Sequence, residues 1–101
     1  MNYENLLVEY ENSVATIILN RPNVMNALNS QMRAELTDAV TRYSKEARVV
    51  VLTGAGNSFC SGQDLGDGHS LQSLDLERTL RDEYEPLINS IVNSPVPTVT
   101  A

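Results

Sequence analysis

Residues 49–65 read VVVLTGAGNSFCSGQDL, and this stretch decides the fold class. Residues 49–53 form a short apolar run rich in valine, which predicts a strand buried on both faces of a parallel sheet. The small and polar residues 54–58 predict a loop directly after that strand. Ligands of parallel α/β folds bind beyond the carboxyl ends of the strands. Any binding site is therefore expected in this loop or just after it.

On the N-terminal side, the sequence predicts a β-hairpin. Residues 6–11 alternate weakly and residues 14–19 are rich in β-branched types, with Asn12 and Ser13 as a plausible turn between them. Pro22 ends the second strand because proline cannot donate a hydrogen bond to a β-ladder.

An amphipathic helix is expected next, with Asn29 or Ser30 as its N-cap. Apolar residues recur at helical spacing and should pack on a core: Met32, Leu36, Val40 and Tyr43. Charged residues occupy the opposite face: Arg33, Glu35, Asp38 and Arg42. The order strand, strand, helix, strand implies an α/β layer with a right-handed crossover.

A second amphipathic helix is indicated after residues 66–70, whose composition predicts a flexible loop. Its apolar residues are Leu76, Leu80, Tyr84, Leu87 and Ile91. Pro86 should kink it, since proline lacks an N–H and crowds the preceding turn. Its acidic residues suggest a solvated face, with acid/base chemistry as the alternative: Asp75, Glu77, Asp82, Glu83 and Glu85. Residues 96–101 then begin an extended segment.

Length and composition predict one small domain over residues 1–101. The net charge of −6 argues against nucleic acid and membrane surfaces as partners, and it is unfavourable for a phosphate-bearing ligand. The single cysteine, Cys60, excludes an intrachain disulfide and fits a reducing compartment. With no signal peptide or membrane span expected, the predicted location is the cytoplasm.

Residues 58–65 are the candidate site. The small residues at 60–62 would let a ligand approach the backbone closely. If a helical turn begins near Asp64, its free N–H groups favour negative charge, such as a developing oxyanion. The alternative is a tight strand-to-helix connection that binds nothing.

Two pairs of motifs resemble the crotonase (enoyl-CoA hydratase/isomerase) superfamily. The first is the strand end at residues 19–22 followed by Asn-Ala-Leu at 26–28, and the second is Leu-Thr-Gly-Ala-Gly at 52–56 followed by residues 59–65. Their order and spacing agree with the family over essentially the whole chain. Residues 60–65 look most like those of ring-1,2-epoxyphenylacetyl-CoA isomerases. The resemblance implies the N-terminal portion of the crotonase (ClpP/crotonase-like) ββα spiral fold, truncated, so the domain would be a partial one.

The resemblance also implies roles. The backbone N–H of Gln63 would belong to an oxyanion hole that stabilises the enolate of an acyl-CoA thioester. Residues implied to bind substrate or CoA are Ala27, Leu28, Ser61, Gly62, Gln63, Asp64 and Leu65. Asp64 reads better as an N-cap or loop brace than as a base. No metal and no cofactor is implied, because coenzyme A is part of the substrate.

By the same resemblance, the second oxyanion N–H and the acid/base residues would follow residue 101. The chain alone is therefore expected to be inactive, and hydration and isomerisation cannot be told apart. An edge strand at residues 96–101 and exposed apolar faces would favour a homo-oligomer. The alternatives are a non-catalytic CoA-binding or self-associating α/β module, and a plain α/β domain without a ligand.

Four further residues have two interpretations each. Cys60 could be a nucleophile but reads better as a structural thiol. His69 could be a metal ligand or base, although a lone histidine among glycines favours solvent exposure. Tyr84 could contact an acyl group or pack in the core. Arg21 could reach a CoA phosphate or serve in a surface turn.

Overall fold

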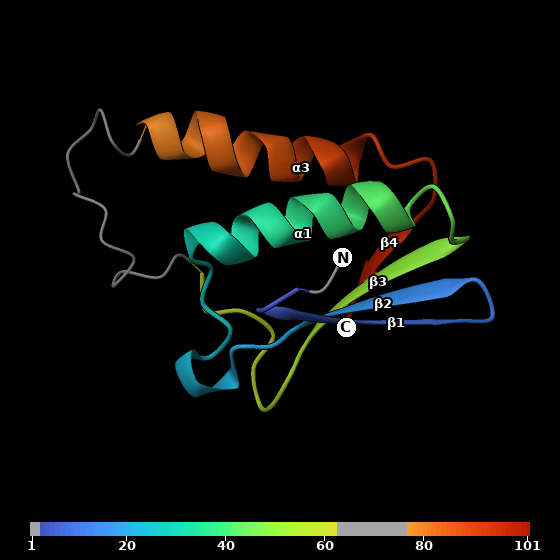
Figure 1. Cartoon of the computed structure of the whole chain (residues 1–101), viewed down its shortest axis with the longest axis horizontal. Coiled ribbons are helices and arrows are strands. Elements are labelled where there is room, and N and C mark those ends of the chain that lie inside the picture. Colours follow the sequence, from blue (N-terminus) through green and yellow to red (C-terminus); the bar gives the residue numbers. More distant parts are fainter. Residues whose placement is uncertain (1–2, 63–76) are drawn as a thin grey trace.

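The structure, a computed structural model, describes residues 3–62 and 77–101. A four-stranded sheet carries helices on one face (Figure 1). The elements in chain order are β1 (Leu6–Glu11), β2 (Val14–Leu19), the 3-10 helix η1 (Pro22–Val24), α1 (Ser30–Tyr43), β3 (Val49–Gly54), the π-helix η2 (Leu80–Tyr84), α3 (Glu85–Val92) and β4 (Thr98–Thr100). The predicted α/β class is confirmed.

The sheet has the strand order β1-β2-β3-β4. β1 and β2 are antiparallel, as predicted, and are joined by Asn12 and Ser13 with φ of 53° and 66°. Positive φ at both positions matches the twist of a two-residue hairpin turn. β2, β3 and β4 are mutually parallel, with Leu19 opposite Gly54. This register places the carboxyl ends of β2 and β3 side by side.

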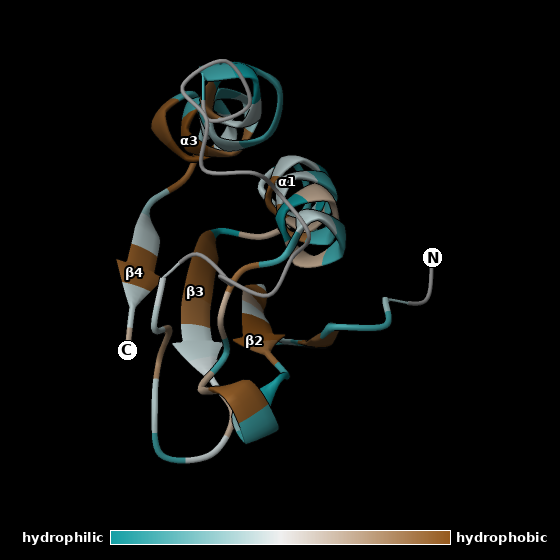
Figure 2. Ribbon diagram, turned by 90° about the vertical axis from the view of Figure 1, so that its left-hand side faces the viewer, coloured by the Kyte–Doolittle hydropathy of each residue, from teal (hydrophilic) through white to brown (hydrophobic). Residues whose placement is uncertain are grey.

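The core lies between the sheet and α1. Burial alternates along β2, where Ala15, Ile17 and Leu19 point inward, and along β3, where Val50 and Leu52 do. The expectation that β3 is buried on both faces is wrong, because its other residues are only half-buried. The helices α1 and α3 lie on the same side of the sheet (Figure 2), and among the described residues no α-helix covers the second face.

Helix α1 begins as predicted. Asn29 is the N-cap, and its side chain accepts a hydrogen bond from the Met32 amide at 2.8 Å. The assignment of Arg33 and Glu35 to a solvated face is wrong, because both side chains are buried. The second helical segment packs over this part of α1, and a Glu35 carboxylate oxygen accepts from the Asn5 amide at 2.8 Å.

The second helix changes its phase at η2. The Glu85 amide bonds to the Leu80 carbonyl, an i to i−5 contact that adds one residue to the turn. Residues before this turn are rotated by roughly 100° relative to the predicted stripe. Leu80 is consequently 49% exposed, against the prediction, while Thr79 is 2% exposed and takes the inward position. The irregularity lies next to Pro86, at the start of α3, where distortion was predicted. Residues 66–70, Asp75 and Leu76 lie outside the described residues.

The sheet ends at β4, which pairs with β3 and is an edge strand as predicted. Large apolar side chains stay exposed on α3 and β4, namely Ile88, Val92 and Val99. Figure 2 shows apolar segments, coloured brown, in both α3 and β4. Over residues 3–62 and 77–101, no helix combines the length and apolar character needed to cross a membrane.

Candidate functional site

Two loops leave the sheet side by side, at the carboxyl ends of β2 and β3. We call residues 20–28 the first loop and residues 55–62 the second loop. The Leu28 amide donates to the Gly62 carbonyl at 2.7 Å, and the Ser61 amide donates to the Met25 carbonyl at 3.1 Å. Backbone hydrogen bonds between segments more than 30 residues apart thus fasten the two loops together.

Asn26 ties the loops at their centre. It is 0% exposed and adopts φ of 56°, a left-handed conformation that asparagine tolerates better than most residues. Its side-chain oxygen accepts from the Arg21 amide at 2.7 Å. Its side-chain nitrogen donates to the carbonyls of Ala55 at 2.9 Å and Ser58 at 2.7 Å. One buried amide therefore satisfies three backbone groups in both loops.

Two glycines shape the second loop for different reasons. A Cβ on Gly54 would overlap the carbonyl oxygens of Ser58 and Phe59, so the loop can fold back only over a residue without a side chain. Gly62 has φ of 98°, which side-chain-bearing residues rarely adopt, although a Cβ there would meet open space. Gly54 thus permits close packing, whereas Gly62 permits a backbone conformation.

The structure brings together the sequence-predicted site residues that it describes. Ala27 is buried and Leu28 half-buried in the first loop, while Ser61 and Gly62 are exposed in the second. Gln63, Asp64 and Leu65 were also predicted for the site and lie outside the described residues. Sequence reasoning missed the role of Asn26, although the residue stands in a quoted motif. The available signal was an asparagine four residues after Pro22, because asparagine is enriched at positive φ.

Cys60 and Arg21 both support the loops. The half-buried Cys60 packs against the core, and its sulfur accepts from the Gly62 amide at 3.4 Å. These contacts support the structural interpretation of the thiol. The Arg21 guanidinium donates to the Ala27 carbonyl at 2.6 Å, so Arg21 is at least a brace of the first loop. His69, which was considered as a metal ligand or a general base, lies outside the described residues.

Arg33 places a buried charge beside the first loop. Its guanidinium donates to Glu83 at 2.6 and 2.9 Å, to the Leu28 carbonyl at 2.9 Å and to the Tyr84 hydroxyl at 3.1 Å. Burial lowers the Arg33 pKa, but hydrogen bonding to Glu83 and attraction to Tyr84 and Glu83 outweigh it, so the net pKa is raised. Arg33 is therefore a fixed cation. Tyr84 is half-buried and its ring lies 4.7 Å from the guanidinium carbon, so it packs on Arg33, while contact with an acyl group stays a prediction.

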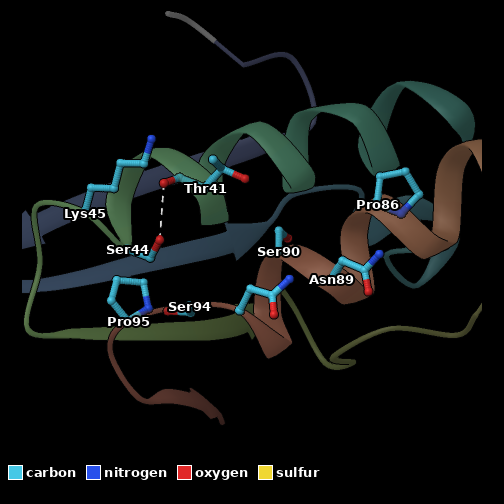
Figure 3. Close-up of a pocket in the computed structure, with 9 residues that line it drawn as sticks. Thr41, Ser44, Lys45, Pro86, Asn89, Ser90, Ser94 and Pro95 are labelled. Atoms are coloured by element: carbon cyan, nitrogen blue, oxygen red, sulfur yellow. Dashed lines mark hydrogen bonds between the residues drawn. The ribbon is translucent and has the colours of Figure 1, made fainter.

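Two surface hollows formed by described residues lie along the helix pair. One of about 330 Å³ lies between the end of α1 and α3 and is lined by Thr41, Ser44, Lys45, Pro86, Asn89, Ser90, Asn93, Ser94 and Pro95 (Figure 3). The Ser44 hydroxyl there donates to the Thr41 carbonyl at 3.2 Å and caps the end of the helix. A second hollow, of about 420 Å³, includes Asp82 and Glu83. Neither is lined by residues of the two loops.

The chain resembles a known family in both sequence and structure. The family model described as enoyl-CoA hydratase/isomerase matches residues 9–101. The chain belongs to this family, within the crotonase superfamily. The predicted fold is also confirmed: a crystal structure of an enoyl-CoA hydratase from Mycobacterium smegmatis superposes with a TM-score of 0.84 and 30% identity over 95% of this chain and 38% of that chain.

Curated relatives include proteins named for different reactions. A "probable enoyl-CoA hydratase" of Rhodobacter capsulatus is 52% identical over 100% of this chain. The 1,2-epoxyphenylacetyl-CoA isomerase of Escherichia coli is 34% identical over 97% of this chain. This chain spans 39% of the length of each of these relatives. The comparisons thus support the family, and the predicted likeness to the isomerase is one of several such relationships.

Proposed function

We propose that the paired loops form one half of an acyl-CoA site. The backbone N–H of Gln63 donates to the thioester carbonyl and stabilises the enolate oxygen that develops when the α-proton is removed. Ala27 and Leu28 flank the ligand on one side and residues 61–65 flank it on the other. Coenzyme A enters as part of the substrate, and the protein supplies no metal.

The supporting observation is the pair of backbone hydrogen bonds between the loops. Residues 27–28 and residues 61–62 were assigned to one ligand from separate motifs, and the Leu28 amide contacts the Gly62 carbonyl at 2.7 Å. Oxyanion donors lower a barrier only when they are held in place before the reaction. A loop fastened at both of these positions meets that requirement better than a free loop.

The proposal assigns binding, not turnover, to residues 1–101. From the family resemblance, we expect the second oxyanion donor and the acid/base residues to follow residue 101. Removing one oxyanion donor typically costs a factor of about 10²–10³ in rate, and loss of general acid/base catalysis costs about 10²–10⁴ more. We therefore expect the 101-residue chain to bind acyl-CoA without measurable hydration or isomerisation. In the family's complete proteins, these loops would serve a hydratase or an isomerase.

A second candidate function is self-association without catalysis. Ile88, Val92 and Val99 expose apolar surface on α3 and on the edge strand β4. Exposed apolar faces and unpaired strand edges promote contacts between copies. Sedimentation of the chain over a hundredfold concentration range tests this. Assembly without acyl-CoA binding would favour this second function, and a monomer at the highest concentration would contradict the predicted homo-oligomer.

Calorimetric titration tests the first proposal. The chain is titrated with acetyl-CoA, with the bulkier phenylacetyl-CoA and with free CoA, which has no thioester carbonyl. We expect both thioesters to bind more tightly than free CoA. If a demonstrably folded chain binds neither thioester, or binds them no better than free CoA, the proposed half-site is wrong.

Two glycines of the second loop provide a matched control. Gly56 and Gly62 both have positive φ, 77° and 98° respectively, so alanine strains the backbone at either position. Gly62→Ala should weaken acetyl-CoA binding about tenfold, because the loop must shift where Leu28 contacts it. A Cβ on Gly56 would also lie 3.1 Å from that of Pro22, so Gly56→Ala should cost at least as much stability as Gly62→Ala, yet leave the affinity within about twofold. Equal losses of affinity would contradict a local role for Gly62.

A further inference from the structure

Arg33 is a buried cation whose partner Glu83 is 27% exposed. It is 0% exposed, and its guanidinium bonds to Glu83, Tyr84, Ser30 and Leu28. A buried ion pair usually stabilises a fold no better than well-packed apolar side chains of the same volume. The contacts of the guanidinium therefore need to be considered for what they position.

The Leu28 peptide is held at both ends. Its carbonyl accepts from the Arg33 guanidinium at 2.9 Å, and its amide donates to the Gly62 carbonyl at 2.7 Å. The carbonyl precedes the N-cap Asn29, outside the hydrogen-bonded ladder of α1. The side chain of Arg33 thus supplies the partner that the helix does not.

The other side of the guanidinium is fixed to the second helical segment. Glu83 accepts from both Nε and one terminal nitrogen, at 2.9 and 2.6 Å, and Tyr84 lies under the guanidinium plane. Both partners belong to η2, the segment in which the helix gains a residue. A planar, forked donor can join these groups to a carbonyl in one orientation, whereas a lysine ammonium is a single point charge.

We propose that Arg33 is a positioning residue that fixes the Leu28–Gly62 hydrogen bond, and with it the second loop, relative to η2. The role rests on the proposed function, since the thioester-binding amide of Gln63 would directly follow the second loop in the sequence. Arg33 touches no ligand in this account. It acts through the Leu28 peptide, and Glu83 holds its guanidinium in the required orientation.

The first test needs no ligand. The scalar coupling between the Leu28 amide nitrogen and the Gly62 carbonyl carbon reports their hydrogen bond in the folded state by NMR. We expect this coupling in the parent chain and its loss in Arg33→Met, which keeps the apolar stem but removes every donor. Arg33→Lys, which is gentler on folding, should also lose it. Retention of the coupling in either folded variant overturns the proposal.

A buried residue of the same helix provides the control. Val40→Ala truncates a side chain of α1 that is 0% exposed, and Val40 lies three turns along the helix from Leu28. It should lower stability and leave the coupling intact, because it removes no contact of the Leu28 peptide. Loss of the coupling in Val40→Ala as well would show that any weakening of α1 suffices, and would contradict a specific role of Arg33.

The second test measures selectivity for the thioester. Loss of folded protein lowers the affinities for acetyl-CoA and free CoA by the same factor, so their ratio is unchanged. Loss of positioning lowers the ratio, and we expect a decrease of up to about tenfold in Arg33→Lys, which corresponds to one hydrogen bond between uncharged groups. An unchanged ratio contradicts the proposal. If the parent chain binds no thioester, the proposed function fails, and the NMR coupling alone decides whether Arg33 fixes Leu28.

Discussion

The two ends of the sheet turn the chain by different means. At one end, β1 passes to β2 through Asn12 and Ser13, whose hairpin pairing joins near neighbours in the sequence. At the other end, the first and second loops are fastened by Asn26, by the Leu28–Gly62 hydrogen bond and by close packing over Gly54. Both ends use residues with positive φ. Among the described residues only one of them, Asn26 at the second end, is buried.

The difference shows that the hairpin turn only reverses the chain, whereas the paired loops are also held in a defined position relative to each other. A hairpin turn has to satisfy only the twist of its two strands. The paired loops satisfy backbone groups far apart in the sequence through one buried side chain, and mutation of such a network is costly. Loops that carry function are commonly held on a rigid scaffold. We therefore place the site at the end of the sheet that carries the first and second loops.

Replacing an asparagine at each end should give the largest contrast. Asn26→Ala removes a side chain that is 0% exposed and its hydrogen bonds to three backbone groups, and it should lower the free energy of unfolding by about 4 kcal/mol. Asn12→Ala, at a similar positive φ but in an exposed turn, should cost about 1 kcal/mol. Urea unfolding of both variants measures this. Costs within 1 kcal/mol of each other would remove the distinction between the two ends.

Gly54 should be less tolerant of a methyl group than Gly62. Gly54→Ala forces backbone carbonyls apart and should lower the free energy of unfolding by about 3 kcal/mol. Gly62→Ala adds a methyl group in open space and carries only the cost of positive φ, about 1–2 kcal/mol. Thermal unfolding followed by circular dichroism ranks the two. The reverse order would mean that close packing over Gly54 does not hold the second loop.

A substitution in the hairpin turn should increase stability. Ser13 has φ of 66°, which strains a residue with a side chain, and its side chain is not fully buried. Ser13→Gly relieves the left-handed strain and should raise the free energy of unfolding by about 1 kcal/mol. The gain is measurable as an increased urea midpoint. A loss of stability would show that this end is also specified by its side chains.

The smallest effect on stability is expected from the hydrogen bond between Tyr3 and Asp38, which lies outside the paired loops. Burial, followed by the hydrogen bond to Asp38, raises the pKa of Tyr3 from 10.0 to about 12. The folded state thus favours the protonated phenol, so this stabilisation is present below pH 10 and lost as the pH rises to about 12. Tyr3→Phe should therefore show a shallower fall in stability over this interval. Identical pH profiles would contradict the shift.

Local patterns predicted much of the fold. Alternation and turn residues placed β1, β2 and their turn at the observed positions, and Asn29 was one of two candidate N-caps. These features depend on neighbours in the sequence. The motifs at residues 26–28 and 59–62 also identified segments that the structure joins.

Long-range contacts explain the errors. Helical spacing assigned Arg33 to solvent, because nothing in α1 alone shows that Glu83 and Tyr84, about 50 residues later, cover it. The extra residue in η2 moved Leu80 outward, and a regular 3.6-residue period cannot predict that shift. Asn26 joins the two loops through hydrogen bonds to carbonyls of the second loop, and sequence spacing alone does not predict where these carbonyls lie.

Amide hydrogen exchange of the ligand-free chain tests the central claim that the paired loops are preformed. We expect slow exchange of three amides, those of Asn26, Leu28 and Ser61, because each donates a hydrogen bond within or between the two loops. Their protection should approach that of Ile17 in the core strand β2. If these three amides exchange as fast as freely exposed loop amides while Ile17 stays protected, the loops are not held together and the account is contradicted.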